Sequence, residues 1–191
     1  MSCAGSLPKP KSNSVSFETR SGTLTVMRGR DGQNTMSLPS DPVAPFEGPA
    51  GFAAAIGKAL GTTAPNEVHK GRYIFAVWDD AAAVRAIKGA GNIASVLRSV
   101  GNWGLIATAK GDGDLDFVSR FFAPDKGVPE DSVTGSAHCA LTPFWAQRLG
   151  KKTLKARQVS PRGGQLTCTD DGARTILSGP CALYMRAEIE V

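Results

Sequence analysis

The sequence lacks the apolar runs and cysteine spacings that mark a membrane protein, a metal site or a disulfide scaffold. No segment reaches the ~20 consecutive apolar residues that a membrane-spanning helix needs. The four cysteines show no C-x-x-C spacing, and so few in a chain of this size predict no disulfide framework. Residues 1–14 hold no apolar stretch of a secretory signal, so we expect a disordered tail there and a reducing, cytoplasmic setting.

The charge and composition of the chain restrict the kinds of partner that we expect it to bind. The chain has 191 residues, a formal net charge of +5, 41% hydrophobic residues and only 7% aromatic residues. This content can bury one sizeable core with an attached remnant. The densest basic stretch, residues 151–157, has no interleaved aromatic side chains on which bases would stack, so we predict no nucleic-acid partner. A small anionic substrate fits the positive balance instead.

Short strands separated by turn residues dominate the pattern, which predicts an α+β fold. A three-strand meander is predicted at residues 15–20, 23–28 and 33–38, with turns at Ser21-Gly22 and residues 30–32. A proline-rich linker follows at residues 39–49. The later strands are predicted at residues 72–78, 105–109, 116–122, 156–160, 165–169, 174–177 and 182–191. Helices are predicted at residues 52–60, 81–87 and 93–100, with a stop at Gly61 and with Glu67 and His69 in a loop.

A polar loop at residues 119–136 runs directly into an apolar segment at residues 137–149. Apolar side chains recur there every three or four positions, which predicts an enclosed central helix. Pro143 falls inside it and removes a backbone hydrogen bond, so we expect a kink or a second short helix.

The start of this helix has the features of an anion site. Thr134 is placed to cap the helix, and Gly135 lets a ligand approach the backbone closely. The N–H groups of Gly135, Ser136 and Ala137 would then face a pocket with partial positive charge. A carboxylate is the simplest group to bind there.

These segments resemble the PhzF family of phenazine-biosynthesis isomerases, which shares its fold with diaminopimelate epimerase. Residues 157–166, RQVSPRGGQL, are similar to the family's Q-x-S-x-R-G-G run, and residues 17–24, FETRSGTL, to its F-x-T-x-S-G-x-L hairpin. The resemblance implies a mixed β-sheet wrapped around a central helix. Residues 44–191 would form one complete C-terminal domain, and residues 15–43 a meander remnant of an N-terminal domain.

The resemblance also implies site residues. The family's E-D-P-x-T-G-S pattern places Asp131 and Ser136 in the active site as catalytic residues, with Ser132 in place of the proline. The substrate-binding residues that we expect are Thr134, Gly135, Ala137, Arg162 and Gly163. The family's E-x-N-x-S-E-T segment, with its catalytic glutamate, and its G-H motif do not occur in the chain. We therefore expect a site that is incomplete in a single chain.

Several candidates also have a plain structural interpretation. Asp131 is equally an ordinary cap or turn residue, and a tight hairpin explains Arg162 as well as an anion clamp does. His138 fits a hydrogen-bonded core histidine better than a base, because residues two apart on a helix point away from each other. Cys139 is expected to be a small buried hydrophobe, and Glu18 a solvent-facing strand residue.

Three functions remain open. The first is an isomerase that moves a proton on a small cyclic or amino carboxylic acid, which the resemblance implies works without metal or cofactor. The second is a catalytically silent small-acid binder that retains half of the pocket. The third is an interaction module that completes a site by pairing with another chain. We expect a homodimer formed partly through the meander, because open strand edges recruit partners, and no membrane partner.

Overall fold

The computed structural model describes residues 13–19, 22–29, 32–182, 185 and 187. The strands are β1 (Ser14–Thr19), β2 (Gly22–Arg28), β3 (Asn34–Pro39), β4 (Ala44–Pro45), β5 (Glu67–Lys70), β6 (Ile74–Trp78), β7 (Leu105–Lys110), β8 (Phe117–Ala123), β9 (Val128–Asp131), β10 (Thr153–Gln158), β11 (Gly164–Asp171) and β12 (Arg174–Gly179). The helices are α1 (Phe52–Leu60), α2 (Ala81–Arg85), α3 (Ile93–Arg98), the 3-10 turn η1 (Pro124–Lys126) and α4 (Gly135–Leu149).

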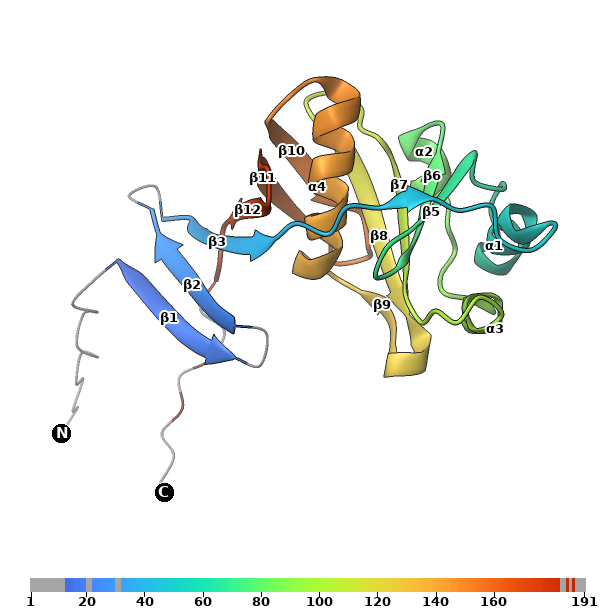
Figure 1. The fold of residues 1–191 in the computed structure, drawn as a ribbon, viewed down its shortest axis with the longest axis horizontal. Helices are drawn as coiled ribbons and strands as arrows, with labels where there is room; N and C mark the ends of the chain where they lie inside the picture. Colours follow the sequence, from blue (N-terminus) through green and yellow to red (C-terminus); the bar gives the residue numbers. More distant parts are fainter. Residues whose placement is uncertain (1–12, 20–21, 30–31, 183–184, 186, 188–191) are drawn as a thin grey trace.

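All described strands belong to one mixed sheet, as Figure 1 shows. Its order is β1-β2-β3-β12-β11-β10-β8-β7-β6-β5-β4, and β9 pairs with β8 beside this path. Parallel pairs join β6 to β7 and β8 to β10, and the other pairs are antiparallel. The predicted α+β class, with a mixed sheet and a central helix, is confirmed.

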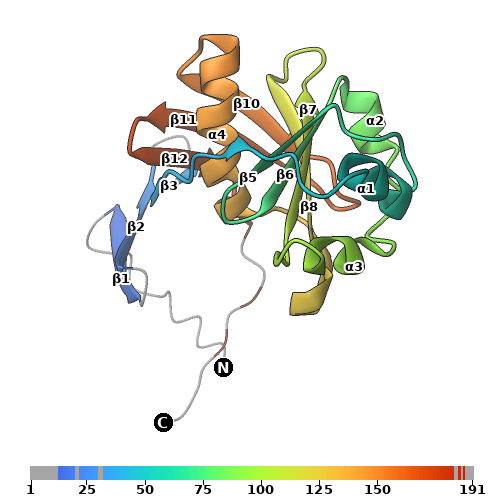
Figure 2. The same cartoon turned by 45° about the vertical axis from the view of Figure 1, so that its right-hand side comes forward.

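The sheet separates two hydrophobic cores because its central strands are buried on both faces. In β6, Ile74, Ala76 and Trp78 pack with α1, α2 and α3, whereas Phe75 and Val77 pack with α4 on the opposite face. This alternation follows from the two-residue period of a strand. Figure 2 shows α4 crossing the sheet apart from the three shorter helices.

A kink or a second short helix was expected at Pro143. Helix α4 runs without interruption through that residue, so the second of these alternatives is wrong. Proline has no N–H, which leaves the carbonyl of Cys139, four residues earlier, without its helical donor. The backbone N–H of Asp41 donates to that carbonyl at 3.0 Å. A segment just after β3 therefore supplies the missing hydrogen bond and fastens itself to the helix.

The meander is part of the same sheet, since β3 pairs along its length with β12. Cross-strand pairs Val15–Val26 and Phe17–Leu24 give β1 and β2 one apolar face. Figure 1 shows these two strands standing away from the main body, and residues Val15 and Phe17 are 49% and 53% exposed.

Some predicted boundaries differ from the structure. Glu67 and His69 lie in β5, not in a loop, because they pair with Val77 and Phe75 of β6. Strand β9 was not predicted; it is short and has no run of β-forming residues. Gly61 does end α1 in a left-handed conformation, as predicted.

Other predicted segments lie wholly or largely outside the described residues. These are the tail at 1–14, apart from its last two residues, most of the strand at 182–191, and the meander turns at Ser21-Gly22 and residues 30–32, apart from Gly22 and Gly32. Across the part of the chain that is described, no helix is both long and apolar enough to cross a membrane.

Candidate functional site

The start of α4 is organised by one buried amide, Gln158, at the end of β10. The burial of β10 alternates strictly, and Gln158 takes a core position with 0% exposure. Its Oε1 accepts the backbone N–H of Thr134 at 2.8 Å, and its Nε2 donates to the carbonyl of Asp131 at 2.7 Å and to the Thr134 hydroxyl at 3.2 Å. A buried amide with this many partners fixes the loop that leads into the helix.

Thr134 occupies the N-cap position, but its side chain does not cap the helix as predicted. Its hydroxyl donates to Oδ2 of Asp131 at 2.6 Å instead. A short hydrogen bond to a carboxylate is stronger than a cap bond between neutral groups, which explains why the Thr134 hydroxyl bonds Asp131 and not a backbone N–H of the helix. The first-turn N–H groups, including those of Gly135, Ser136 and Ala137, consequently have neither a helical acceptor nor the Thr134 side chain.

Ser136 is the predicted catalytic residue that opens directly on a cavity. Its hydroxyl shares a 2.9 Å hydrogen bond with the hydroxyl of Tyr73, whose ring is buried between Trp103 and Phe121. The cavity has a volume of about 400 Å³. Its described lining consists of Leu24, Leu38, Pro39, Ser40, Asp41, Arg72, Ser136 and Cys139.

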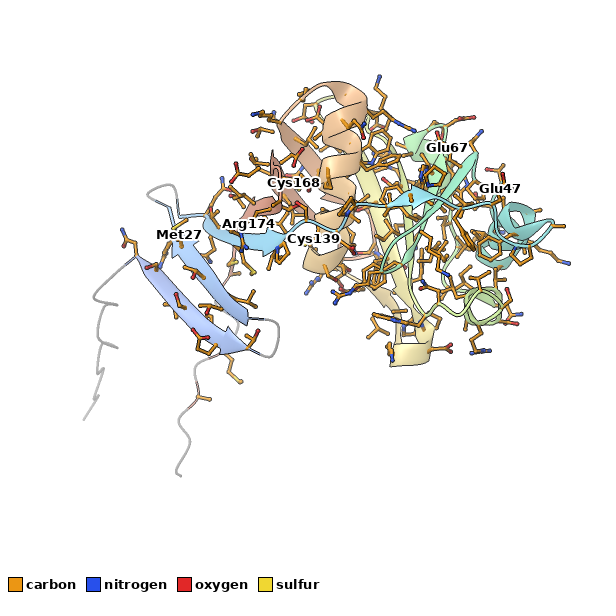
Figure 3. All side chains as sticks on the ribbon, viewed as in Figure 1. Met27, Glu47, Glu67, Cys139, Cys168 and Arg174 are labelled. Atoms are coloured by element: carbon orange, nitrogen blue, oxygen red, sulfur yellow. The ribbon has the colours of Figure 1, made fainter. Side chains whose placement is uncertain are left out.

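The cavity lies where the meander, the segment after β3 and the first turns of α4 meet. Figure 3 labels Cys139 on α4 beside β3. Asp131, which accepts the hydroxyl of Thr134, is not among the described lining residues. The structure thus links Asp131 to the helix start through hydrogen bonds but does not bring its carboxylate into the same cavity wall as Ser136.

A buried ion pair positions β9 and therefore Asp131. Arg120 of β8 donates from Nε and Nη2 to the two carboxylate oxygens of Glu130, both at 2.7 Å. The side chains are only 6% and 13% exposed, and Arg120 also donates to the carbonyl of Ile87. Asp131, the next residue along β9, pairs with Phe121 of β8.

The two titratable side chains that follow Ser136 on α4, His138 and Cys139, are poorly suited to proton transfer. His138 is completely buried, its Nδ1 bonds the carbonyl of Thr134 at 2.7 Å, and its Nε2 has no partner among the described atoms. Burial lowers the pKa of His138 to about 4. Burial raises the pKa of the Cys139 thiol to about 11. Both results confirm the interpretation of these residues as core residues.

Neither Arg162 nor Gly163 is among the described residues that line the cavity of Ser136. Arg162 lines a different cavity, of about 390 Å³, together with Arg85 and Arg157 on the α2 side of the sheet. Gly163 has a left-handed backbone (φ 66°) and donates its N–H to Ser160 Oγ at 3.0 Å. A turn that requires glycine accounts for Gly163 without a ligand.

Sequence reasoning missed several residues at this site, namely Asp41, Arg72, Tyr73, Arg120, Glu130 and the central role of Gln158. Of these residues, only Gln158 could have been predicted from its neighbours in the sequence, because it occupies the next buried position after Leu154 and Ala156 in an alternating strand. The others meet through long-range packing. Among the described residues, no group of three or more His, Cys, Asp or Glu side chains is placed to hold a metal ion.

Comparisons with known proteins agree with this architecture. The PhzC-PhzF family, described as phenazine biosynthesis-like protein, matches residues 2–186. An uncharacterized isomerase of Pseudomonas aeruginosa is 41% identical over 175 residues, covering 92% of this chain and 64% of that protein. A second uncharacterized isomerase of that organism is 38% identical over 178 residues, covering 93% and 64%.

Comparison with solved structures also finds proteins of the PhzF family. A PhzF family phenazine biosynthesis protein of Enterococcus faecalis matches with a TM-score of 0.82 and 35% identity, over 96% of this chain and 67% of that one. The chain spans slightly less than two thirds of the two bacterial isomerases. Because the family match covers nearly the whole chain, the predicted resemblance is confirmed, and the chain belongs to the PhzC-PhzF family of phenazine biosynthesis-like proteins.

Proposed function

We propose that this chain binds a small carboxylic acid at the start of α4 and contributes to an isomerase reaction that moves a proton on it. The observation that supports this most is the position of Ser136, whose hydroxyl is held by Tyr73 at a cavity beside uncapped helix amides. The names of the two bacterial relatives, both isomerases, favour the reaction class.

In this proposal the residues have separate roles. Ser136 and the amides of Gly135 and Ala137 hold the carboxylate at the positive end of the helix. Asp131 lies outside the described wall of this cavity, and its role in the proposal is to hold the loop before the helix start through Thr134 and Gln158. Arg162 and Gly163 belong to the supporting turn, since Ser160 of that turn donates to the carbonyl of Ser132 at 2.8 Å.

Neither of the two buried titratable side chains near Ser136 is suited to carry the proton. General acid–base catalysis needs a group that titrates near the working pH. His138 and Cys139 have pKa values of about 4 and about 11 and are buried. We propose that the carrier is a glutamate of a partner segment or chain, so that this chain supplies the orienting half of a complete site.

A catalytically silent acid binder is the second candidate. The same shifted pKa values of His138 and Cys139 favour it, because binding does not need a proton carrier. The two candidates differ in one respect. If a glutamate-bearing family segment added in trans restores turnover, the isomerase proposal holds; if the acid binds and no such segment yields turnover, the chain is a binder.

We also propose that the meander joins a second copy of the chain. Strand β1 is the outermost of the described strands at its end of the sheet, and its apolar face leaves Val15 and Phe17 about half exposed. Antiparallel pairing of two β1 edges gives a two-fold, self-complementary contact. Sedimentation should show a dimer at micromolar concentration that Phe17→Glu converts to monomer, with Met27→Glu, on the opposite face of β2, as the control. A wild-type monomer would contradict this.

Mutation at the helix start tests the binding proposal. Ser136→Ala should weaken binding of a benzoate-type acid by roughly tenfold, because one hydrogen bond to a charged group is lost. Binding is followed through the backbone amide resonances of Gly135 and of residue 136. Ser99→Ala, which removes a surface hydroxyl bonded to its own helix, is the matched control. If the acid leaves these resonances unmoved at millimolar concentration, the proposal fails.

A further inference from the structure

The cavity on the α2 side of the sheet is lined by arginines and is separate from the cavity of Ser136. The two cavities share no described lining residue. The arginine cavity has a volume of about 390 Å³, and its described lining consists of Arg85, Leu115, Arg157, Val159, Ser160, Pro161 and Arg162. No acidic side chain is among these residues, so the described wall is positive.

Arg85 of α2 is held in position by a carboxylate outside the described wall. Its Nη1 and Nη2 donate to the two carboxylate oxygens of Asp112 at 2.7 and 2.8 Å. This bidentate pair balances the charge of Arg85 but leaves some N–H groups of the guanidinium free to donate. Arg85 therefore offers hydrogen bonds from a fixed position without adding net charge.

The charges of Arg157 and Arg162 are not balanced in this way. Within the described ranges, no ion pair involves either side chain. Lys155 lies two residues before Arg157 on the same face of β10 and pairs with Asp114 at 3.5 Å. Because Asp112 and Asp114 are both engaged by other cations, the lining keeps the positive charges of Arg157 and Arg162.

The backbone that carries these two arginines is rigid. Arg157 belongs to β10, which is hydrogen-bonded to β8 on one side and to β11 on the other. Arg162 lies in the turn that Ser160 closes, because Ser160 Oγ accepts the N–H of Gly163 at 3.0 Å and donates to the carbonyl of Ser132 at 2.8 Å. A ligand that binds both arginines consequently does not have to order the backbone first.

Two guanidinium groups without a carboxylate partner match a ligand that carries two negative charges. A phosphate monoester has a charge of about −1.5 to −2 at pH 7 and three terminal oxygens, and arginine binds pairs of such oxygens. A carboxylate has one charge and can satisfy only one of the two arginines. The volume of about 390 Å³ is in the range of small-molecule sites, which leaves room for an organic group beside the phosphate.

We propose that this cavity binds a small phosphate monoester, at a site that does not depend on the proposed function at Ser136. Arg157 and Arg162 bind the phosphoryl oxygens, Arg85 donates a further hydrogen bond, and the apolar lining residues contact the carbon skeleton. No aromatic side chain is among the described lining residues. Because bases stack on aromatic rings, this wall favours a small phosphorylated molecule over a nucleic acid.

Titration with four probes tests the proposal. Ribose 5-phosphate carries the phosphate and the organic group, inorganic phosphate only the anion, ribose only the organic group, and acetate a single charge. Binding is read from the backbone amide resonances of residues 162 and 163 in the whole chain. Ribose 5-phosphate should bind roughly tenfold more tightly than inorganic phosphate, which should bind roughly tenfold more tightly than acetate, and ribose should not bind.

Two variants assign the binding to its residues. Arg157→Gln and Arg162→Gln should each weaken ribose 5-phosphate by roughly tenfold, because each removes a hydrogen bond between charged groups. Both residues are exposed, so the variants should keep the fold. Arg98→Gln removes the same charge from an arginine that pairs with Asp125 outside the described lining, and this control should leave the affinity unchanged.

Several results would overturn the proposal. One is that ribose 5-phosphate leaves the resonances of residues 162 and 163 unmoved at millimolar concentration, and another is that acetate or inorganic phosphate binds as tightly as ribose 5-phosphate. Equal weakening by Arg98→Gln would show attraction by net charge alone. Tighter binding of a single-stranded oligonucleotide through the same resonances would show a nucleic-acid site instead. None of these results affects acid binding at Ser136, which is read from residues 135 and 136.

Discussion

The ion pair between Arg120 and Glu130 should be among the most costly polar contacts to break in this chain. Both side chains are nearly buried, at 6% and 13% exposure, and two 2.7 Å hydrogen bonds join them. Glu130→Leu removes both acceptors and leaves the buried guanidinium with the carbonyl of Ile87 as its one remaining hydrogen-bond acceptor among the described residues. Loss of one partner of a buried pair costs about 3–5 kcal/mol.

Urea unfolding measures this loss of stability, and the same measurement on an exposed ion pair gives the value with which to compare it. Asp125→Asn breaks the pair of Asp125 with Arg98, whose side chains are 30% and 60% exposed, and should cost at most about 1 kcal/mol. Replacing both buried charges, in the double variant Arg120→Met with Glu130→Leu, should recover most of the lost stability, because no charge stays buried without a partner. If Glu130→Leu costs no more than Asp125→Asn, the argument that this pair anchors β9 is refuted.

Three further measurements probe the site and the pH dependence of stability. Gln158→Leu should lower the unfolding free energy by about 1–3 kcal/mol, because the backbone N–H of Thr134 loses its acceptor, and should speed hydrogen exchange at that amide; unchanged exchange would contradict it. The pKa of His138 is about 4 in the folded chain and 6.5 in the unfolded chain, so the unfolded chain takes up a proton first as the pH falls. The free energy of unfolding should therefore drop by up to about 3 kcal/mol between pH 6.5 and pH 4, and His138→Gln should not show this drop. The hydrogen bond from Arg148 lowers the pKa of Glu67 from 4.5 to about 2, so the ionised Glu67 stabilises the fold above pH 4.5 and this stabilisation is lost as the pH falls toward 2. Because the Glu67 side chain is 40% exposed, Glu67→Gln should lower the free energy of unfolding by at most about 1 kcal/mol. A larger loss would contradict the interpretation of this ion pair as a surface pair.

The sequence was informative wherever one element carried its own pattern. The apolar spacing after Ser136 predicted α4, and Gly61 predicted the end of α1, because these signals depend on neighbouring residues. The hydrogen bond from the N–H of Asp41 to the carbonyl of Cys139 joins two segments that approach only in the folded chain, so the sequence could not predict it.

The candidate site was predictable in part for the same reason. Thr134, with the residues that follow it, was correctly placed at the helix start, but whether its hydroxyl would cap the helix or bind Asp131 depends on the conformation of the loop. Arg72 and Asp41 lie in sequence segments with no motif, and only the fold brings both to the cavity of Ser136.

The most direct test of the account is proton transfer by this chain on a dihydro-hydroxyanthranilate, with and without a family segment that carries the glutamate. The chain alone should bind the acid but turn it over about two to four powers of ten more slowly than the reconstituted site, because it orients the substrate without a proton carrier. Adding the segment should restore turnover, and Asp131→Ala should abolish the restored activity. Turnover by the chain alone at the reconstituted rate would contradict the account, and loss of that turnover in Asp41→Asn would then identify Asp41 as the base.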